Sequence, residues 1–468
     1  MDTPTCPPPR DDREKEILDK LVAIRDRLLL LKQDRTTYIR SQDVLPLYEE
    51  TIEQVRLLNE ARTSDRREEN RVDRVLESCF QLLSLFFMTI GRNNEAPAAY
   101  ALTSTVRRLL DHLTEVDLYS VKDLESISHT LTKLEQNVKT TETEYPPYLI
   151  TLLSNRLELC DKSLANLRKR LERFEDPLPK TYEKLISILR SMSLANTRTK
   201  FSPSEVQKLQ AQLREIEEKR QEGKLLTADG KTPGGFDEVT ALLEKCLLWS
   251  DFVLQRKGVI PDSFKPTYDI LFRIRNELEK LSITQAWSLR EADLFDFQRQ
   301  LDKIDESRVE GNWVDDEGKP AELYVQRTML YLIRRSYAYI YSLMISSEPV
   351  SEALLPIYNQ LQTLKRCLIE VKNSGGVQSV RELYPYSMKL HSIDNMRQDG
   401  KFMINDDIPE GQGSVTELLL NVRGSTMSSE SPRLVFTGTG GQIQQKEGLS
   451  PAPQVLKNAT VDHLVHSI

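Results

Sequence analysis

The sequence predicts an all-α protein, an elongated array of antiparallel helices in three-helix repeats of roughly 88 residues. The main observation is a motif that occurs three times: Leu-x-x-Ile, an acidic residue, then Arg and Gly four and seven residues after the Ile. Its glycines, Gly223, Gly311 and Gly400, are 88 and 89 residues apart (311 − 223 and 400 − 311). A second observation is the composition, since 29% charged residues, 39% apolar residues and only 18 Gly favour helices over strands.

The motif itself has a simple physical interpretation. Leu and Ile three residues apart mark the buried stripe of a helix, and Gly suits the left-handed conformation that closes a helix C-terminus. Arg220, Arg308 and Arg397 then lie in the last turn, where a cation meets the negative end of the helix dipole. We therefore interpret the motif as a helix stop signal used three times. A ligand loop used three times is the alternative.

The same patterns divide the chain into four parts. Residues 1–12 are rich in proline and are predicted to be disordered. Residues 13–143 hold five predicted helices, at 13–38, 42–62, 68–91, 97–117 and 120–139. Residues 144–403 hold three repeats of three helices, at 148–174, 178–196 and 203–222, at 236–257, 264–283 and 289–310, and at 321–346, 351–373 and 377–399. From 404 to 468 Gly, Ser, Gln and Pro replace the periodic pattern, which predicts a disordered tail.

Helix starts support these boundaries. The middle helix of each repeat opens with a proline in its first turn, where the missing N–H would be unpaired anyway. These prolines are Pro179, Pro266 and Pro356. Third helices open with capping boxes such as Ser202-Pro203-Ser204-Glu205. In the third repeat Pro385 follows the box closely and is expected to kink or shorten the helix.

Composition also argues against several classes of protein. A net charge of −7 offers no large positive field, so we expect no nucleic-acid binding. The five cysteines, at 6, 79, 160, 246 and 367, include no C-x-x-C pair, which favours reduced core cysteines. No secretory signal opens the chain, and the longest apolar run, residues 79–90, is too short to span a bilayer. We predict no transmembrane segment, and composition does not predict the oligomeric state.

The sequence contains no set of residues with the spacing of a known catalytic site. Gly230-Lys231-Thr232 lacks the strand and the first glycine of a phosphate-binding loop, and the chain contains no H-E-x-x-H or G-x-S-x-G. We therefore predict no catalytic residue, cofactor or metal ligand, and a protein that is not an enzyme. An enzyme with an unfamiliar site at the Gly-Lys loops of Lys231 and Lys319 is a less favoured alternative.

Two regions hold candidate protein-binding residues. Helix 321–346 carries five tyrosines with three arginines, and its candidates are Tyr331, Arg334 and Arg335. A core helix whose Tyr hydroxyls reach the surface is the alternative, which we favour. In the tail, Leu464, Val465 and Ile468 follow helical spacing and are candidates for docking into a partner's groove, with plain disorder as the alternative. Ser431 and Ser450 precede prolines and are candidate phosphorylation sites.

Three stretches carry a resemblance to a known family: Tyr145–Leu149 (YPPYL), Glu215–Leu225 (EIEEKRQEGKL) and Gly318–Arg335 (GKPAELYVQRTMLYLIRR). They resemble a fungal family of uncharacterised, all-helical proteins with a domain of unknown function, over roughly residues 15 to 405. The resemblance implies an intracellular protein of the cytoplasm, with the nucleus as a second compartment. It implies no reaction, cofactor or site residue.

These observations lead to one functional hypothesis and two alternatives. Helical repeat arrays present extended surfaces that most often bind proteins, so we expect a non-enzymatic intracellular scaffold or adaptor whose protein partners the sequence does not name. A peripheral membrane or lipid-binding protein is the first alternative, although the acidic balance disfavours it. The enzyme described above is the second.

Overall fold

The computed structural model describes residues 7–62, 70–92, 95–116, 118–140, 145–227, 229–284, 293–346, 350–373, 380–404 and 407–430. Within these ranges the fold is all-α, as predicted, with one two-stranded hairpin. The helices are α1 (Asp12–Gln33), α2 (Ser41–Ala61), α3 (Arg71–Thr89), α4 (Ala96–Val116), α5 (Val121–Thr140), α6 (Pro147–Leu171), α7 (Leu178–Asn196), α8 (Pro203–Gln221), α9 (Phe236–Arg256), α10 (Lys265–Thr284), α11 (Leu294–Glu306), α12 (Leu323–Ser346), α13 (Leu355–Asn373), η2 (Val380–Leu383), α14 (Tyr384–Asp394) and α15 (Gln412–Glu430), and the strands are β1 (Arg397–Gln398) and β2 (Lys401–Phe402).

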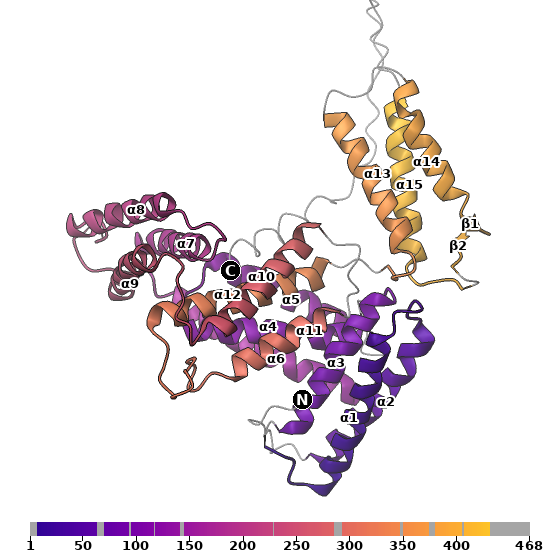
Figure 1. Cartoon of the computed structure of the whole chain (residues 1–468), viewed down its shortest axis with the longest axis horizontal. Helices are drawn as coiled ribbons and strands as arrows, with labels where there is room; N and C mark the ends of the chain where they lie inside the picture. Colours follow the sequence, from indigo (N-terminus) through magenta and orange to yellow (C-terminus); the bar gives the residue numbers. More distant parts are fainter. Residues whose placement is uncertain are drawn as a thin grey trace, which may run out of the picture.

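The helices pack in consecutive groups of three, which we call trios 1 to 5 (Figure 1). Trio 1 is α1–α3, trio 2 is α4–α6, trio 3 is α7–α9, trio 4 is α10–α12 and trio 5 is α13–α15. In each trio the third helix packs against both of the others. The repeat therefore extends through the amino-terminal region as well, which the sequence analysis treated as a separate five-helix region.

The helix positions agree with the predicted period, but the grouping differs by one helix. We predicted trios that start at α6, α9 and α12, whereas these helices complete the trios that precede them. The reason is that the chain turns back after the Gly motif, so the next helix packs onto the two helices before it. Pro385 lies in the first turn of α14, which begins at Tyr384 after the short η2, so the expected shortening is confirmed.

The three Gly motifs share a positive φ but not one conformation. Gly223 closes α8 in a Schellman motif, in which the N–H of Lys224 donates to the carbonyl of Lys219. The other two glycines close two-residue hairpin turns instead, after Glu310 (φ 49°) and Asp399 (φ 49°). The interpretation as a helix stop signal is therefore correct for the first copy and wrong for the other two.

The motif arginines follow the same division. Arg220 lies in the last turn of α8, but Arg308 and Arg397 lie beyond the ends of α11 and α14. Each arginine instead forms an ion pair with the acidic residue three positions before it. These pairs are Arg220–Glu217, Arg308–Asp305 and Arg397–Asp394. The features that all three copies of the motif share are therefore this ion pair and the positive φ of the Gly.

A glutamine from the third helix fixes the chain after each hairpin turn. Gln326 of α12 accepts a hydrogen bond from the backbone N–H of Trp313 (3.0 Å) and donates one to its carbonyl (2.9 Å). Gln412 of α15 does the same for Phe402, at 3.0 and 2.8 Å. Both aromatic side chains are buried. Trios 4 and 5 are therefore built alike at their turn as well as in their helices.

The described residues form two hydrophobic cores. One is shared by trios 1 to 4, and the other belongs to trio 5 alone. Trio 5 stands out from the rest of the molecule (Figure 1). It joins the body where the N–H of Glu352 donates to the carbonyl of Thr89 (2.8 Å), and Ser351 packs against Gly91. Trios 1 to 4 thus behave as one packed body with trio 5 attached at the end of α3.

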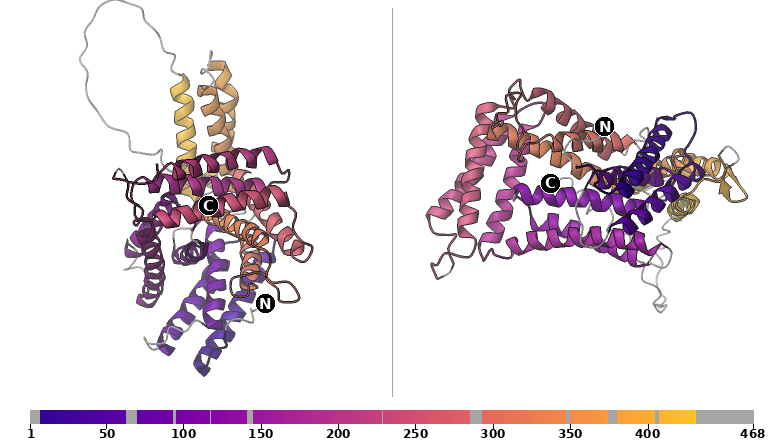
Figure 2. Two further views of the ribbon diagram at one scale, coloured as in Figure 1. Left: turned by 90° about the vertical axis from the view of Figure 1, so that its left-hand side faces the viewer. Right: turned by 90° about the horizontal axis from the view of Figure 1, so that it is seen from below.

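The body closes on itself rather than extending in a line. Helix α12 packs against α4, α7 and α9, and α11 packs against α3. Viewed from below, trio 3 lies at one end of the body and connects trio 2 to trio 4 (Figure 2). Because the fourth trio returns to the first and second, α12 is surrounded by helices of three trios.

Parts of both segments predicted to be disordered belong to the described structure. The tail predicted from residue 404 contains α15, whose buried Val415, Leu418, Leu419 and Val422 follow helical spacing. At the other end, the carbonyl of Pro7 accepts a hydrogen bond from the N–H of Arg71, so residues 7–11 lie against the body. Residues 1–6 and 431–468 lie outside the described ranges.

Candidate functional site

The Gly-Lys loops proved to be two copies of one turn. Thr227 and Asp315 each use a side-chain oxygen to accept the backbone N–H of the lysine four residues later, at 3.1 and 2.8 Å. In both loops the N–H of the Gly also donates to the carbonyl of the first residue. Lys231 and Lys319 are exposed. This turn explains the Gly-Lys pattern, because the turn is held by a hydrogen bond from the backbone N–H of each lysine and does not involve its ammonium group.

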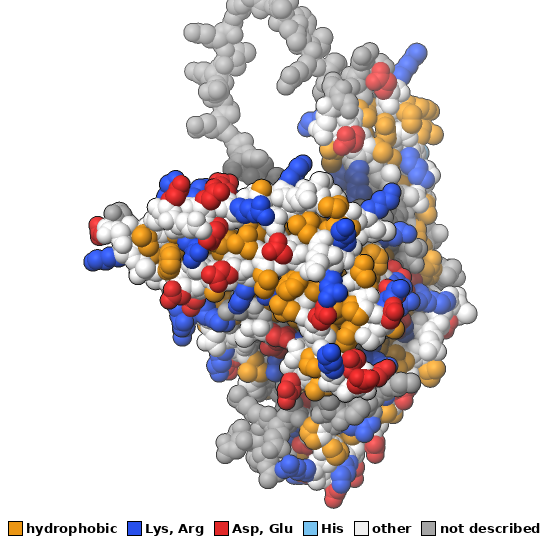
Figure 3. Space-filling model, turned by 60° about the vertical axis from the view of Figure 1, so that its left-hand side comes forward, with side chains coloured by type: hydrophobic (Ala, Val, Ile, Leu, Met, Phe, Trp, Pro, Cys, Tyr) orange, Lys and Arg blue, Asp and Glu red, His pale blue; other side chains and the backbone are white. Residues whose placement is uncertain are grey.

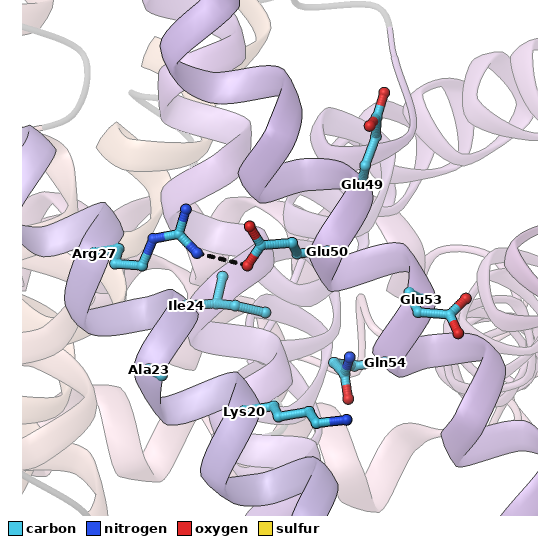
Figure 4. A pocket seen from close by; sticks show the side chains of 8 residues that line it. All are labelled: Lys20, Ala23, Ile24, Arg27, Glu49, Glu50, Glu53 and Gln54. Carbon is cyan, nitrogen blue, oxygen red and sulfur yellow. Dashed lines mark hydrogen bonds and ion pairs between the residues drawn. The ribbon is translucent and has the colours of Figure 1, made fainter.

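A surface hollow lies between α1 and α2 (Figure 4). Arg27 of α1 bridges it to Glu50 of α2 at 2.6 Å, with Ile24 between the helices. Glu53, on the same rim, pairs with Arg56 at 2.5 Å. Lys20 and Glu49 also line the hollow, so its lining carries charges of both signs, and we assign it no ligand.

A buried ionic network holds α11 against α4. Arg108 of α4 pairs with Asp302 (3.3 Å), which also accepts a hydrogen bond from Tyr337 of α12 (2.8 Å). His112, one turn further along α4, reaches Asp305 at 3.3 Å. All five side chains are largely or fully buried. The network therefore ties trio 4 to trio 2 with charges that are shielded from water.

The network shifts the pKa values of its members in opposite directions. Burial raises the pKa of Asp302, although the Arg108 guanidinium opposes this rise. Burial also acts to raise the pKa of Asp305, but a hydrogen bond from His112 and the nearby charges lower it to about 2. Burial and the Asp302 carboxylate raise the pKa of Tyr337. The network thus contains one carboxylate that is held ionised by its partners and one whose charge is costly.

Beside this network, side chains of trios 3 and 4 lie around Arg334 at what we call the arginine junction: Arg190, Arg308, Arg327, Tyr331 and Arg334. The last three are on α12, at i, i+4 and i+7, so they share one stripe of the helix. All five are partly accessible to solvent. The stripe therefore faces the place where trios 2, 3 and 4 converge.

Two arginines of the junction are neutralised by carboxylates of trio 2. Arg190 of α7 forms an ion pair with the buried Asp123 at the start of α5. Arg308 pairs with Glu115 of α4 at 2.5 Å and with Asp305 at 2.6 Å. These pairs bring both guanidiniums to the junction and hold them there.

The other two arginines are not neutralised in this way. The only hydrogen bond that Arg334 makes within the described residues is to the carbonyl of Leu330, at 3.2 Å. Arg327 lies over the ring of Trp249, 5.7 Å from its centre. Burial lowers the pKa of Arg334 to about 10, with Glu115 opposing this and Arg190 adding to it. The junction therefore holds more positive charge than the protein around it compensates.

The structure brings the three α12 candidates to one region, with different surroundings. Tyr331 and Arg334 belong to the junction, and burial raises the pKa of the Tyr331 hydroxyl. Arg335 is buried and donates to the Tyr339 hydroxyl at 3.1 Å, so it belongs to the core. The tail candidates lie outside the described residues; they are Ser431, Ser450, Leu464, Val465 and Ile468.

Sequence reasoning missed Arg190, the participation of Arg308 and the Asp302–Arg108 network. The α12 stripe was visible as Arg-x-x-x-Tyr-x-x-Arg spacing, but Arg190 comes from α7, more than a hundred residues earlier in the chain. Cys79, Cys160 and Cys246 are buried, as the sequence predicts, and burial raises the pKa values of their thiols to about 12, 11 and 12. Such thiols are unreactive at neutral pH.

Two other kinds of site do not occur within the described ranges. No group of three or more His, Cys, Asp or Glu side chains is placed there to hold a metal ion. None of the helices in those ranges has the length and apolar character that crossing a bilayer requires.

The fold and junction define a class: an all-α protein of three-helix trios whose fourth trio closes back on the second. Residues 171–291 match the family described as "Protein of unknown function (DUF2408)". The chain is 38% identical over 417 residues to "CUB1 family protein C30C2.08" of Schizosaccharomyces pombe, which covers 87% of this chain and 90% of that protein. It is 35% identical to "Cu(2+) suppressing and bleomycin sensitive protein 1" of Saccharomyces cerevisiae, covering 87% and 88%.

The chain therefore belongs to the CUB1 family of fungal proteins, and the resemblance inferred from its sequence is confirmed. No solved structure matches it.

Proposed function

We propose that the protein is a non-enzymatic intracellular scaffold, in the cytoplasm and also in the nucleus, that binds protein partners through trio 5. The observation that carries this proposal is the surface of that trio. Tyr384 and Met388, one turn apart on α14, are 64% and 50% exposed. Ile369 of α13 and Leu420 of α15 are exposed as well. Exposed large apolar side chains on each helix of a small unit with its own core favour a protein interface.

The attachment of trio 5 supports the same proposal. Its core is separate from that of the body, and apolar side chains are visible along it at the upper right of Figure 3. On the body in the same view, basic and acidic side chains alternate without a large field of either sign, and apolar side chains are visible there as well. A projecting unit with its own core is suited to binding a partner while the body stays accessible to others.

Proximity labelling in fungal cells tests this proposal with a matched pair of variants. In Y384S/M388S two exposed apolar side chains of trio 5 are made polar. In L30S/V259S two apolar side chains of the body are changed, and these are at least as exposed, at 66% and 67%. We expect the first variant to lose a defined set of labelled proteins while keeping its helical circular dichroism. The control should retain that set.

An identical labelled set for both variants and the unmodified protein would exclude trio 5 as the docking unit.

Lipid binding remains the alternative function, and co-sedimentation with anionic liposomes separates it from protein binding. An enzymatic role at Lys231 and Lys319 predicts that substituting both lysines abolishes activity, whereas a scaffold with these substitutions stays folded and bound.

A further inference from the structure

The arginine junction has an imbalance of charge that packing does not explain. Four guanidiniums of trios 3 and 4 lie near one another, with Arg190, Arg308 and Arg327 around Arg334. Trio 2 supplies Asp123 and Glu115 to only two of them. Within the described residues, Arg327 and Arg334 have no carboxylate at ion-pair distance. A buried or half-buried cation normally has a partner of opposite charge, because removing it from water is costly.

The chemistry of the four side chains narrows the class of the missing partner. Guanidinium groups bind phosphate oxygens with paired N–H donors, and several arginines at one place are typical of sites for multiply charged phosphates. Tyr331 adds a hydroxyl on the same stripe of α12, between Arg327 and Arg334. A single carboxylate would neutralise one of the two unpaired arginines, whereas an anion with two or more phosphate groups satisfies both.

The position of the junction gives such a ligand a structural role. Arg190 belongs to trio 3, Arg308, Arg327 and Arg334 belong to trio 4, and the carboxylates belong to trio 2. An anion bound among these arginines would link trios 3 and 4 directly, and trio 2 through the carboxylates that pair with Arg190 and Arg308, at the point where the body closes. Without it, the like charges repel one another across the same contact.

We propose that the arginine junction binds a small soluble polyphosphate, held by Arg327 and Arg334 with Arg190, Arg308 and Tyr331 around it. The ligand stabilises the closed arrangement of trios 2, 3 and 4. This inference does not depend on the proposed docking surface of trio 5, because the two involve different trios and different chemistry.

Thermal unfolding of the full chain tests the proposal directly. The probes are inorganic phosphate, pyrophosphate and myo-inositol hexakisphosphate, each compared with sodium chloride and sodium sulfate at equal ionic strength. We expect saturable increases in melting temperature of several degrees with the two polyphosphates, small ones with phosphate, and none with chloride. Equal increases with sulfate at the same ionic strength would show a general salt effect and overturn the proposal.

Substitutions at the junction separate a built site from a chance contact. R334M removes a guanidinium whose charge is costly in the folded protein, so its ligand-free melting temperature should equal or exceed that of the unmodified chain. It should also lose at least tenfold in pyrophosphate affinity by calorimetry. R56M is the control, since Arg56 is on the surface of α2 and pairs with Glu53 and Glu60; it should bind normally.

R327M provides a second, independent measurement at the edge of the site, and the same loss of affinity is expected. If R334M and R327M both keep the affinity of the unmodified chain, the ligand binds elsewhere and the assignment is wrong. If either variant loses helical circular dichroism or melts far below the unmodified chain, the guanidinium stabilises the fold without a ligand, which equally contradicts the proposal.

Discussion

Trios 4 and 5 share the same turn and helix arrangement, but trio 4 packs against other trios and trio 5 stands apart. Both contain the Gly hairpin, the arginine paired with an aspartate three residues back, and the glutamine that fixes an aromatic residue. In trio 4 the third helix, α12, is enclosed by α4, α7 and α9. In trio 5 the third helix, α15, packs within its own trio and exposes Leu420.

The difference shows which properties the repeat encodes and which the neighbours add. The hydrogen bonds of the turn are nearly identical, so they depend on local sequence. The buried ionic network and the arginine junction occur only at trio 4 among the described residues, because they need charges supplied by trios 2 and 3. Function in this fold therefore depends on which trios meet, and the comparison can be tested by substituting matched residues in both.

The largest expected effect comes from the buried network. R108M leaves the buried carboxylate of Asp302 with only Arg299, at 4.0 Å, and it should destabilise the body by about 3 kcal/mol in urea unfolding. The matched variant R397M in trio 5 leaves Asp394, which is 24% exposed and lies 3.5 Å from Arg423. It should cost less than about 1 kcal/mol. Similar losses in both variants would show that the surroundings of trio 4 add no stability.

The helices themselves could be predicted from sequence because an apolar stripe is a local property. Helix α15 was missed although Val415, Leu418, Leu419 and Val422 show that stripe, because the composition after residue 404 was given more weight than the spacing. The grouping into trios could not be predicted, since the same stripe can pack against the helix before it or the helix after it.

The arginine junction illustrates the limit of prediction more clearly. The stripe on α12 could be recognised from the spacing of Arg327, Tyr331 and Arg334. Its meeting with Arg190 depends on the closure of the body, which depends in turn on long-range contacts such as Arg308 with Glu115. Charges that are far apart in sequence carry no pattern that reveals such a meeting.

The glutamine contacts provide a second test of the comparison. Q326A and Q412A each remove two hydrogen bonds to the backbone of a buried aromatic residue, at a cost of about 1–3 kcal/mol. Hydrogen exchange should locate the two losses differently. Q412A should increase exchange within trio 5 only, whereas Q326A should also affect α4 and α7, which pack on α12. Exchange confined to trio 4 in Q326A would indicate that the body is not one cooperative unit.

The pH dependence of the body should depend on Asp305. Its pKa is lowered from the ordinary value of 3.8 to about 2, so its ion pairs stabilise the folded protein above pH 3.8. This contribution is lost as the pH falls from about 4 towards 2, and it amounts to at most about 2 kcal/mol. D305N should therefore be less stable than the unmodified chain at pH 7, with the difference shrinking by pH 2.5. The control D26N changes an exposed carboxylate of α1, and at pH 7 it should cost less stability than D305N.

The smallest effects are expected at the hairpin glycines, where the two trios differ least. Gly311 and Gly400 have φ values of 79° and 80°, a conformation that costs a residue with a Cβ roughly 1 kcal/mol. In G400A the new Cβ meets no atom within 4 Å, so the backbone cost alone should appear. In G311A it lies 3.3 Å from a carboxylate oxygen of Glu115, which pairs with Arg308, so this ion pair must shift. Chemical unfolding should show G311A to be the more destabilised by a few tenths of a kcal/mol, because only trio 4 has a neighbour at that turn.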